Sequence, residues 1–327
     1  MRENELIDKI ERALGGRFSR SRQVSLGIGD DAALFRPQPG HELILSCDWF
    51  LEGTHFLQDQ HPPDSVGWKC LARALSDVAA MGGVPRCFLL SLALPSSPPG
   101  RWLDGFLAGL RRASQRFACA LAGGDATERS EVLINVTVVG EVQAGRARLR
   151  SGARPGDLIY VSGNLGEAEL GLQILRPSRR LANPKDPLLK KHLYPEPRLE
   201  LGQLLARKRL ASAMLDLSDG LSSDLPRLCA ASGVGARLEI AKIPRARNAH
   251  VARKLGLDPL NLALHGGDDY ELLLTVPPEK AKSLPHPGVT LTPIGSIVEG
   301  SKLFVCDESG PERPLTPGGW DPFRKDR

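Results

Sequence analysis

The chain lacks the short signals that mark metal–sulfur sites, disulfide scaffolds and membrane segments. Its six cysteines stand at positions 47, 70, 87, 119, 229 and 306, and none forms a C-x-x-C pair. That spacing argues against a zinc site and against a disulfide framework. No uncharged apolar run approaches the ~18 residues of a membrane span, and the first residues lack the apolar core of a signal peptide. We therefore expect a cytoplasmic protein with no membrane partner.

An excess of charge of one sign is also missing. The 43 Lys and Arg residues nearly balance the 38 Asp and Glu residues, which leaves a net charge of +5. The arginines are scattered and aromatic residues make up 5% of the chain, so we expect no nucleic-acid partner. With 41% hydrophobic and 25% charged residues over 327 positions, the composition is that of a globular protein long enough for two domains.

The usual nucleotide-binding and hydrolase motifs are absent too. The chain has no G-x-x-x-x-G-K-[ST] loop, no H-R-D or D-F-G kinase set and no G-x-S-x-G elbow. It has instead a recurring pattern of aspartates beside small residues. The pattern occurs in Gly27-Ile28-Gly29-Asp30-Asp31, Ser46-Cys47-Asp48, Ser76-Asp77, Gly123-Gly124-Asp125, Asp216-Leu217-Ser218-Asp219-Gly220 and Gly266-Gly267-Asp268-Asp269.

Most of these aspartates follow runs that predict strands, so we expect them to meet at one sheet edge. Hard oxygen ligands gathered there suit Mg²⁺, which usually arrives with phosphates. A single Asp-Asp pair after glycine is more often a solvated turn, and only the repetition favours a metal–phosphate site.

Strands and helices are predicted in alternation along both halves of the chain. Helices are expected over 3–14, 65–81, 101–117, 167–175, 198–210 and 221–231, and strands over 24–28, 42–46, 87–94, 132–142, 158–162, 213–217, 236–240 and 270–276. The proline-rich stretch 177–197 predicts a surface excursion. A change of composition over 146–156 divides the chain into domains 1–148 and 149–327. The fold class is α/β (α+β), with mixed sheets packed against helices in both domains.

The sequence alone allows two interpretations for each of three candidate residues. Asp77 lies within a predicted helix, either buried with a partner or on its polar stripe. His55 follows Asp48 in a loop, where it is either a ligand contact or a structural histidine. Arg150, in Arg150-Ser151-Gly152-Ala153, offers a cation for a phosphate or is a solvated linker arginine.

The acidic segments resemble, in order along nearly the whole chain, those of the thiamine-monophosphate kinase family. The same resemblance extends over three longer segments: Leu75-Ser76-Asp77-Val78-Ala79-Ala80-Met81-Gly82, the Arg150 segment and Gly266-Gly267-Asp268-Asp269-Tyr270-Glu271-Leu272. That family lies in the superfamily of aminoimidazole ribonucleotide synthetase, selenophosphate synthetase and a hydrogenase maturation factor. A selenophosphate synthetase would have a reactive residue in a glycine-rich N-terminal segment, and the hydrogenase factor would end in cysteine; neither is found. A non-catalytic nucleotide- or metal-binding module is the alternative from another class.

The resemblance implies a two-domain, homodimeric enzyme that uses ATP and several Mg²⁺ ions to phosphorylate thiamine monophosphate to thiamine diphosphate. By motif position, it implies metal contacts for Asp31, Ser46, Cys47, Asp48, Asp77, Asp125, Asp216 and Asp219. It implies ATP contacts for Gly124, Asp125, Arg150 and Ser218, and substrate contacts for His55, Asp268 and Trp320, the last by stacking. Two positions depart from the family pattern. Cys47 replaces a usual Thr, which leaves a backbone carbonyl as the oxygen ligand, and Asp268 replaces a usual Glu.

The acceptor itself suggests a mechanism. A phosphate monoester has a second pKa near 6 and is largely dianionic at neutral pH. Such a nucleophile needs no general base, and we expect direct in-line transfer without a phosphoenzyme.

Overall fold

The computed structural model describes residues 3–14, 22–28, 30–95, 100–178, 180–284, 288–307 and 311–323. Gly29, part of the first acidic motif, lies outside these residues. The chain divides into two compact units. Unit 1 comprises Met1–Val78, Gly83–Gly145 and Leu175–Asp186, and unit 2 comprises Ala79–Gly82, Arg146–Ile174 and Pro187–Arg327. Within the described ranges, no helix has the length and apolar character needed to cross a membrane.

Unit 1 is built around a four-stranded sheet in the order β3-β6-β4-β5. All neighbours are antiparallel except β4 and β5. Its elements are α1 (Glu3–Leu14), β1 (Val24–Leu26), β2 (Leu34–Phe35), β3 (His41–Leu51), α2 (Pro63–Ala80), β4 (Val84–Leu94), α3 (Gly100–Phe117), β5 (Ala120–Glu128) and β6 (Leu133–Gln143).

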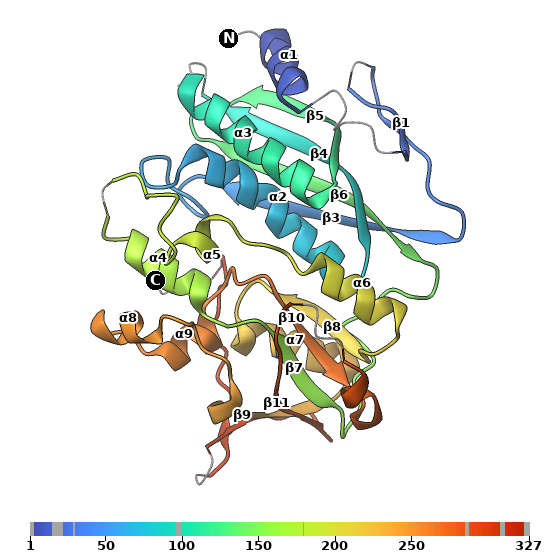
Figure 1. Cartoon of the computed structure of the whole chain (residues 1–327), viewed down its shortest axis with the longest axis vertical. Helices are drawn as coiled ribbons and strands as arrows, with labels where there is room; N and C mark the ends of the chain where they lie inside the picture. The colour runs from blue at the N-terminus through green and yellow to red at the C-terminus, as the bar shows by residue number, and fades with distance from the viewer. Residues whose placement is uncertain are drawn as a thin grey trace. The chain divides into compact units, whose positions relative to one another are not determined.

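The helices α2 and α3 lie side by side over one face of this sheet (Figure 1). Their backbones approach closely: a Cβ at Gly67 of α2 would lie 2.0 Å from the carbonyl oxygen of Phe106 in α3. Alternation along β3 buries Ile44 and Phe50 on the helix-covered face. The opposite face leaves Leu45 68% and Trp49 55% exposed.

Unit 2 contains a seven-stranded sheet in the order β13-β12-β9-β11-β7-β10-β8, antiparallel except between β12 and β9. Its strands are β7 (Leu158–Ser162), β8 (Ala213–Leu217), β9 (Gly235–Glu239), β10 (Glu271–Val276), β11 (Leu291–Val298), β12 (Leu303–Cys306) and β13 (Arg313–Pro314). Its helices are α4 (Glu167–Leu175), α5 (Lys190–Leu193), α6 (Leu199–Arg207), α7 (Leu221–Ser232), η2 (Ile240–Lys242), α8 (Ala249–Lys254), α9 (Pro259–His265) and η3 (Pro278–Ser283). Strands β8 and β10 are buried along their whole length, which explains their near-continuous apolar sequences.

The predicted mixed α/β architecture is confirmed, with two expectations corrected. The acidic motifs of β3 and β5 were expected at strand ends, but Asp48 and Asp125 lie inside these strands, which continue past them. The stretch 177–197 was expected to be a surface excursion. It includes helix α5 and the buried residues Leu189, His192 and Leu193. Its prolines lie between parts of a packed segment.

Candidate active site

One group of predicted metal residues lies on the helix-covered face of unit 1. The Oγ of Ser46, in β3, donates a short hydrogen bond to Oδ2 of Asp77, in α2. Two residues further along β3, Asp48 forms an ion pair with Arg73 of α2 at 3.5 Å between Oδ2 and Nε. Arg73 also lies over the ring of Phe50, 5.5 Å from its centroid. Asp77 is therefore half-buried beside a partner, and Arg73 is a site residue that the sequence did not reveal.

A second group lies on the opposite face of the same sheet. The register pairs Cys47 with Thr137, Thr137 with Leu89, and Leu89 with Gly123. Asp125, two residues after Gly123, is exposed and pairs with Ser91. Directly paired residues point to the same face, so Cys47 and Asp125 share a face that excludes Ser46 and Asp48. The thiol of Cys47 forms a hydrogen bond with the side-chain amide oxygen of Asn135 at 3.4 Å.

Gly124 is required by the close approach of β5 to β4. A Cβ there would lie 1.9 Å from the carbonyl oxygen of Leu90. The glycine before Asp125 therefore has a packing reason, and the ATP contact expected of it would be made by its backbone.

The two remaining predicted residues of unit 1 lie in turns. Asp31 is exposed, and its backbone N–H donates to Oδ1 of Asp30 at 2.8 Å. The Nδ1 of His55 accepts the N–H of Leu51 at 3.0 Å, which fixes the neutral ring with its proton on Nε2. His55 thus has a structural contact on one nitrogen and a donor on the other, which is compatible with both interpretations of the sequence.

In unit 2, the motif 216–220 joins the end of β8 to α7. Asp216 is buried in β8, opposite Leu272 of β10. Asp219 forms an ion pair with Arg227 at 2.5 Å between Oδ2 and Nη1, and its backbone N–H donates to Asp224. Arg227, a residue of α7, is a further charged partner of this loop that sequence reasoning missed.

Arg150 precedes this unit's first strand and has an exposed side chain. Its carbonyl oxygen accepts a hydrogen bond from Ser232 at 2.9 Å, so the backbone is fixed while the guanidinium faces outward. This arrangement suits a phosphate contact.

The loop 266–270 is held against the end of β8. The N–H of Asp268 donates to the carbonyl of Ser218 at 2.8 Å, and that of Tyr270 donates to the carbonyl of Leu217 at 2.9 Å. Asp268 and Tyr270 adopt positive φ values of 65° and 49°, which are costly for residues other than glycine. The hydroxyl of Tyr270 donates to Oδ1 of Asp268 at 2.6 Å and so orients this carboxylate. Asp268 and Ser218, predicted to bind different ligands, are therefore neighbours.

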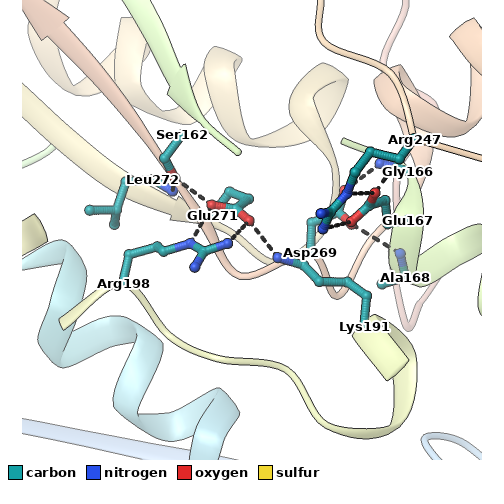
Figure 2. A network of polar contacts seen from close by, with 10 residues as sticks. All are labelled: Ser162, Gly166, Glu167, Ala168, Lys191, Arg198, Arg247, Asp269, Glu271 and Leu272. Carbon is teal, nitrogen blue, oxygen red and sulfur yellow. Dashed lines mark hydrogen bonds and ion pairs between the residues drawn. The ribbon is translucent and has the colours of Figure 1, made fainter. Parts of the chain in front are cut away.

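A buried ionic network anchors the residue that follows this loop (Figure 2). Glu271 is 1% exposed and forms ion pairs with Lys191 and Arg198, the latter at 2.6 Å between Nε and Oε2. The hydroxyl of Ser162 donates to Oε2 at 2.5 Å. Burial alone would raise the pKa of Glu271, but the nearby cations and these hydrogen bonds outweigh it and hold the pKa below its ordinary value. The network explains why the 177–197 stretch is not a loose excursion.

Asp269 anchors the same loop to the start of α4. Its carboxylate accepts the N–H groups of Gly166 at 2.5 Å and Ala168 at 3.1 Å. Burial raises its pKa to about 7, against the lowering effect of Lys191 and of these two hydrogen bonds. Asp269 and Glu271 are therefore buried supports, and Asp268 is the half-buried acid of this motif.

Trp320 lies beside the 216–220 loop. Its backbone N–H donates to the carbonyl of Asp219 at 2.9 Å, and its side chain is half-buried. Phe323, the other aromatic residue of this segment, is 90% exposed.

The donor set suits magnesium. Among the described side chains, no group of three or more His, Cys, Asp or Glu could hold a metal ion by itself. Mg²⁺, however, is commonly held by one or two carboxylates, with the remaining positions taken by waters and substrate phosphates. The Ser46–Asp77 pair and the Asp216–Asp219 loop supply oxygen donors of this kind.

Two family models match the chain. "AIR synthase related protein, N-terminal domain" matches residues 29–142, and "AIR synthase related protein, C-terminal domain" matches residues 154–307. The chain thus belongs to the two-domain AIR synthase-related class. Similarity to the hydrogenase maturation protein HypE in complex with ATP, at 20% identity and a TM-score of 0.78, agrees with the fold alone.

Within that class, the chain belongs to the thiamine-monophosphate kinase family. It is 40% identical over 308 residues to the enzyme of Escherichia coli K12, covering 92% of each chain, and 34% identical over 320 residues to that of Aquifex aeolicus, covering 97% of each. The crystal structure of the Stenotrophomonas maltophilia enzyme matches with a TM-score of 0.81 at 34% identity, covering 95% of this chain and 98% of that one. AaThiL complexed with AMPPCP and TMP matches with a TM-score of 0.78 at 34% identity, covering 99% of both chains.

Proposed function

We propose that this protein phosphorylates thiamine monophosphate to thiamine diphosphate at the expense of ATP, by direct and magnesium-dependent transfer. The single observation that carries the activity is the similarity to AaThiL, complexed with AMPPCP and TMP, over 99% of both chains. The geometry within each unit supports it, because oxygen donors, an outward guanidinium and an oriented acid occur at the matching motifs. The domain division at 148/149 is part of the same proposal.

The proposed roles follow the position of each side chain. Ser46, Asp48 and Asp77 would hold metal from the helix side of the sheet and Asp125 from the other side, and Cys47 would contribute its backbone carbonyl. Asp31, Asp216 and Asp219 would complete the metal contacts. Gly124, Asp125, Arg150 and Ser218 would contact ATP, and His55, Asp268 and Trp320 would hold the thiamine substrate.

In this reaction, the residues of the chain have to bind two anions, ATP and thiamine monophosphate, and align them with each other. Magnesium ions bound there would neutralise phosphate charge and polarise the γ-phosphoryl group. Arg150 offers an exposed guanidinium to phosphate oxygens, and His55 offers a proton on Nε2. Because the acceptor phosphate is already ionised at neutral pH, no side chain has to act as a general base. A cytoplasmic location stays a prediction from the sequence.

We also propose that the protein is a homodimer. Leu43, Leu45 and Trp49 of β3 are 44%, 68% and 55% exposed on the sheet face opposite the helices, and Leu89 of β4 adds 38% on the same face. An exposed apolar strip of this kind favours a second copy, because its burial removes apolar surface from water.

One assay tests the activity. The protein is incubated with ATP, Mg²⁺ and thiamine monophosphate, and thiamine diphosphate is measured by chromatography. Free thiamine is the control acceptor and should remain unreacted, because it has no ionised phosphate. Absence of diphosphate formation would refute the proposed function, and a trapped phosphoenzyme with ATP alone would refute direct transfer.

A further inference from the structure

The segment Gly318–Trp320 is held by its own backbone on the start of α7. The N–H of Gly318 donates to Oγ of Ser222 at 3.2 Å, and the N–H of Gly319 donates to Oγ of Ser223 at 3.1 Å. The next amide, that of Trp320, donates to the carbonyl of Asp219. Three consecutive backbone amides of this segment are thus hydrogen-bonded to the 216–220 loop and to the first turn of α7.

Ser222 has a second partner that fixes its hydroxyl. It is fully buried, and its Oγ lies 2.8 Å from Nδ1 of His265, at the end of α9. Burial lowers the pKa of His265 and so favours the neutral ring. A hydroxyl has one proton and two lone pairs, so Ser222 can bond to Nδ1 of His265 and still accept the N–H of Gly318.

The two glycines are required by the closeness of this contact. A Cβ at Gly319 would lie 2.0 Å from the carbonyl oxygen of Asp219, and one at Gly318 would lie 2.6 Å from Nδ1 of His265. The carbonyl oxygen of Asp219 is a backbone atom, so it cannot move away by a change of side-chain rotamer. The Gly-Gly pair before Trp320 is therefore what lets the segment dock.

Leu315, which is 8% exposed, packs in the core of unit 2, and beyond it little apolar packing holds the flanks of the segment. Residues 316–318 and 321–323 are exposed, and Phe323 is 90% exposed. The net stabilisation from one hydrogen bond is similar to the entropy lost when the backbone of one residue is fixed. The three backbone hydrogen bonds alone therefore favour the docked state only weakly, and a ligand that contacts Trp320 in the docked state alone would strengthen docking.

We propose that Gly318–Trp320 form a detachable strap, and that Ser222 and Ser223 are positioning residues that dock it when the heteroaromatic ring of the substrate binds. The inference rests on the proposed function, which gives Trp320 the stacking role. Because the strap is bonded to the carbonyl of Asp219, docking also fixes the loop that carries this proposed metal residue.

Hydrogen exchange of the C-terminal peptide tests the strap without relying on turnover. We compare the wild type with Ser223→Ala, which removes one docking hydrogen bond, and Gly319→Ala, which blocks docking. The exposed Ser301→Ala is the matched control. Without ligand, exchange at the amides of 319–320 should be about fivefold faster in Ser223→Ala, the factor that loss of about one net hydrogen bond gives. Thiamine monophosphate should slow this exchange in the wild type.

Steady-state kinetics supply the second readout. The KM for thiamine monophosphate should rise about fivefold in Ser223→Ala and further in Gly319→Ala, a larger rise than that of the KM for ATP. A circular dichroism spectrum and thermal midpoint like those of the wild type show that each variant is folded. Unchanged exchange in both variants would overturn the strap, and faster exchange with an unchanged KM would overturn its role in substrate capture. If the wild type makes no thiamine diphosphate, the proposed function fails, whereas the exchange of the unliganded variants still decides whether the strap exists.

Discussion

At the scale of single residues, neighbouring acids in this protein have different tasks. In the sequence, Asp268, Asp269 and Glu271 look alike. In the fold, Asp268 is half-buried and oriented by the hydroxyl of Tyr270, whereas Asp269 and Glu271 are 2% and 1% exposed and tie the loop to neighbouring elements. Substitutions at these positions should therefore separate effects on activity from effects on stability.

Asp77→Asn should lower kcat/KM by on the order of 100-fold or more while leaving the thermal midpoint nearly unchanged. The amide can still accept the hydrogen bond of Ser46, but it lacks the charge that a metal site requires. Kinetics at fixed Mg²⁺ measure the effect, with the exposed Asp59→Asn as the control. Wild-type rates in Asp77→Asn would show that this pair does not belong to the active site.

Glu271→Gln should destabilise unit 2 by about 3–5 kcal/mol, because it leaves Lys191 and Arg198 without their buried counter-charge. Thermal or urea unfolding measures the loss. The matched control is Glu239→Gln, whose ion pair with Lys242 at 2.7 Å joins side chains that are 47% and 52% exposed, so that its loss should cost less than about 1 kcal/mol. Equal effects of the two substitutions would contradict the buried network.

At the scale of elements, close backbone approaches and helix starts set the geometry. The helices α2 and α3 meet through Gly67, where any Cβ would collide with the backbone of Phe106. The start of α4 is capped by Asp269 from a loop about a hundred positions away in the chain. Neither contact follows from the local sequence of the helix.

Gly67→Ala should destabilise unit 1 by about 1–3 kcal/mol, although alanine is the better helix former. The added Cβ would lie 2.0 Å from the oxygen of Phe106 and 2.7 Å from the nitrogen of Leu110, both of them backbone atoms. Gly100→Ala, with nothing within 4 Å of the added atom, is the control and should be neutral or mildly stabilising. The thermal midpoints of both variants, compared with that of the wild type, measure the effect. A Gly67→Ala variant more stable than the wild type would contradict the close packing.

Asp269 should make stability depend on pH. Its pKa is about 7 in the fold against an ordinary value of 3.8, so between these values the unfolded chain has released a proton that the folded protein keeps. The stability contribution is therefore fully present below about 4 and is lost as the pH rises through about 7. Lys191 and Glu271 are the charged groups that face it.

The wild type should accordingly lose stability relative to Asp269→Asn when the pH rises from 5 to 8. The difference in thermal midpoint between the two proteins, measured at both pH values, reports this change. The same measurement on Asp59→Asn, which replaces an exposed side chain, is the control. If the difference in thermal midpoint between the wild type and Asp269→Asn were the same at pH 5 and pH 8, Asp269 would not release its proton between these pH values.

At the scale of the whole molecule, we expect the open face of the sheet in unit 1 to form the contact of the proposed homodimer. Leu45→Glu places a charge in the middle of the exposed apolar strip and should convert the dimer to monomers, because an unpaired charge would be buried on association. Sedimentation or light scattering measures the mass. Leu255→Glu is the control, since Leu255 is 52% exposed after α8 in unit 2. A dimeric Leu45→Glu variant would exclude this face, and a monomeric wild type would exclude the homodimer.

The sequence by itself determined most of the elements and the family. Helical and strand periodicity predicted α1, α3, α4, β7 and β8 closely, because burial of one side is written into the local spacing of apolar residues. The recurring acids and their order predicted the kinase family, and the cysteine pattern argues against zinc and disulfide scaffolds. The helices α8 and α9 and the strands β11 to β13 were not predicted.

The tertiary structure alone decided how the predicted residues are sorted. Cross-strand register separates Cys47 and Asp125 from Ser46, Asp48 and Asp77, and register depends on hydrogen bonds between strands that are far apart in the chain. The roles of Arg73, Tyr270 and Ser223, and the burial of Glu271 between two cations, likewise come from long-range contacts. Local patterns carry no information on such contacts, because each partner is supplied by an element elsewhere in the fold.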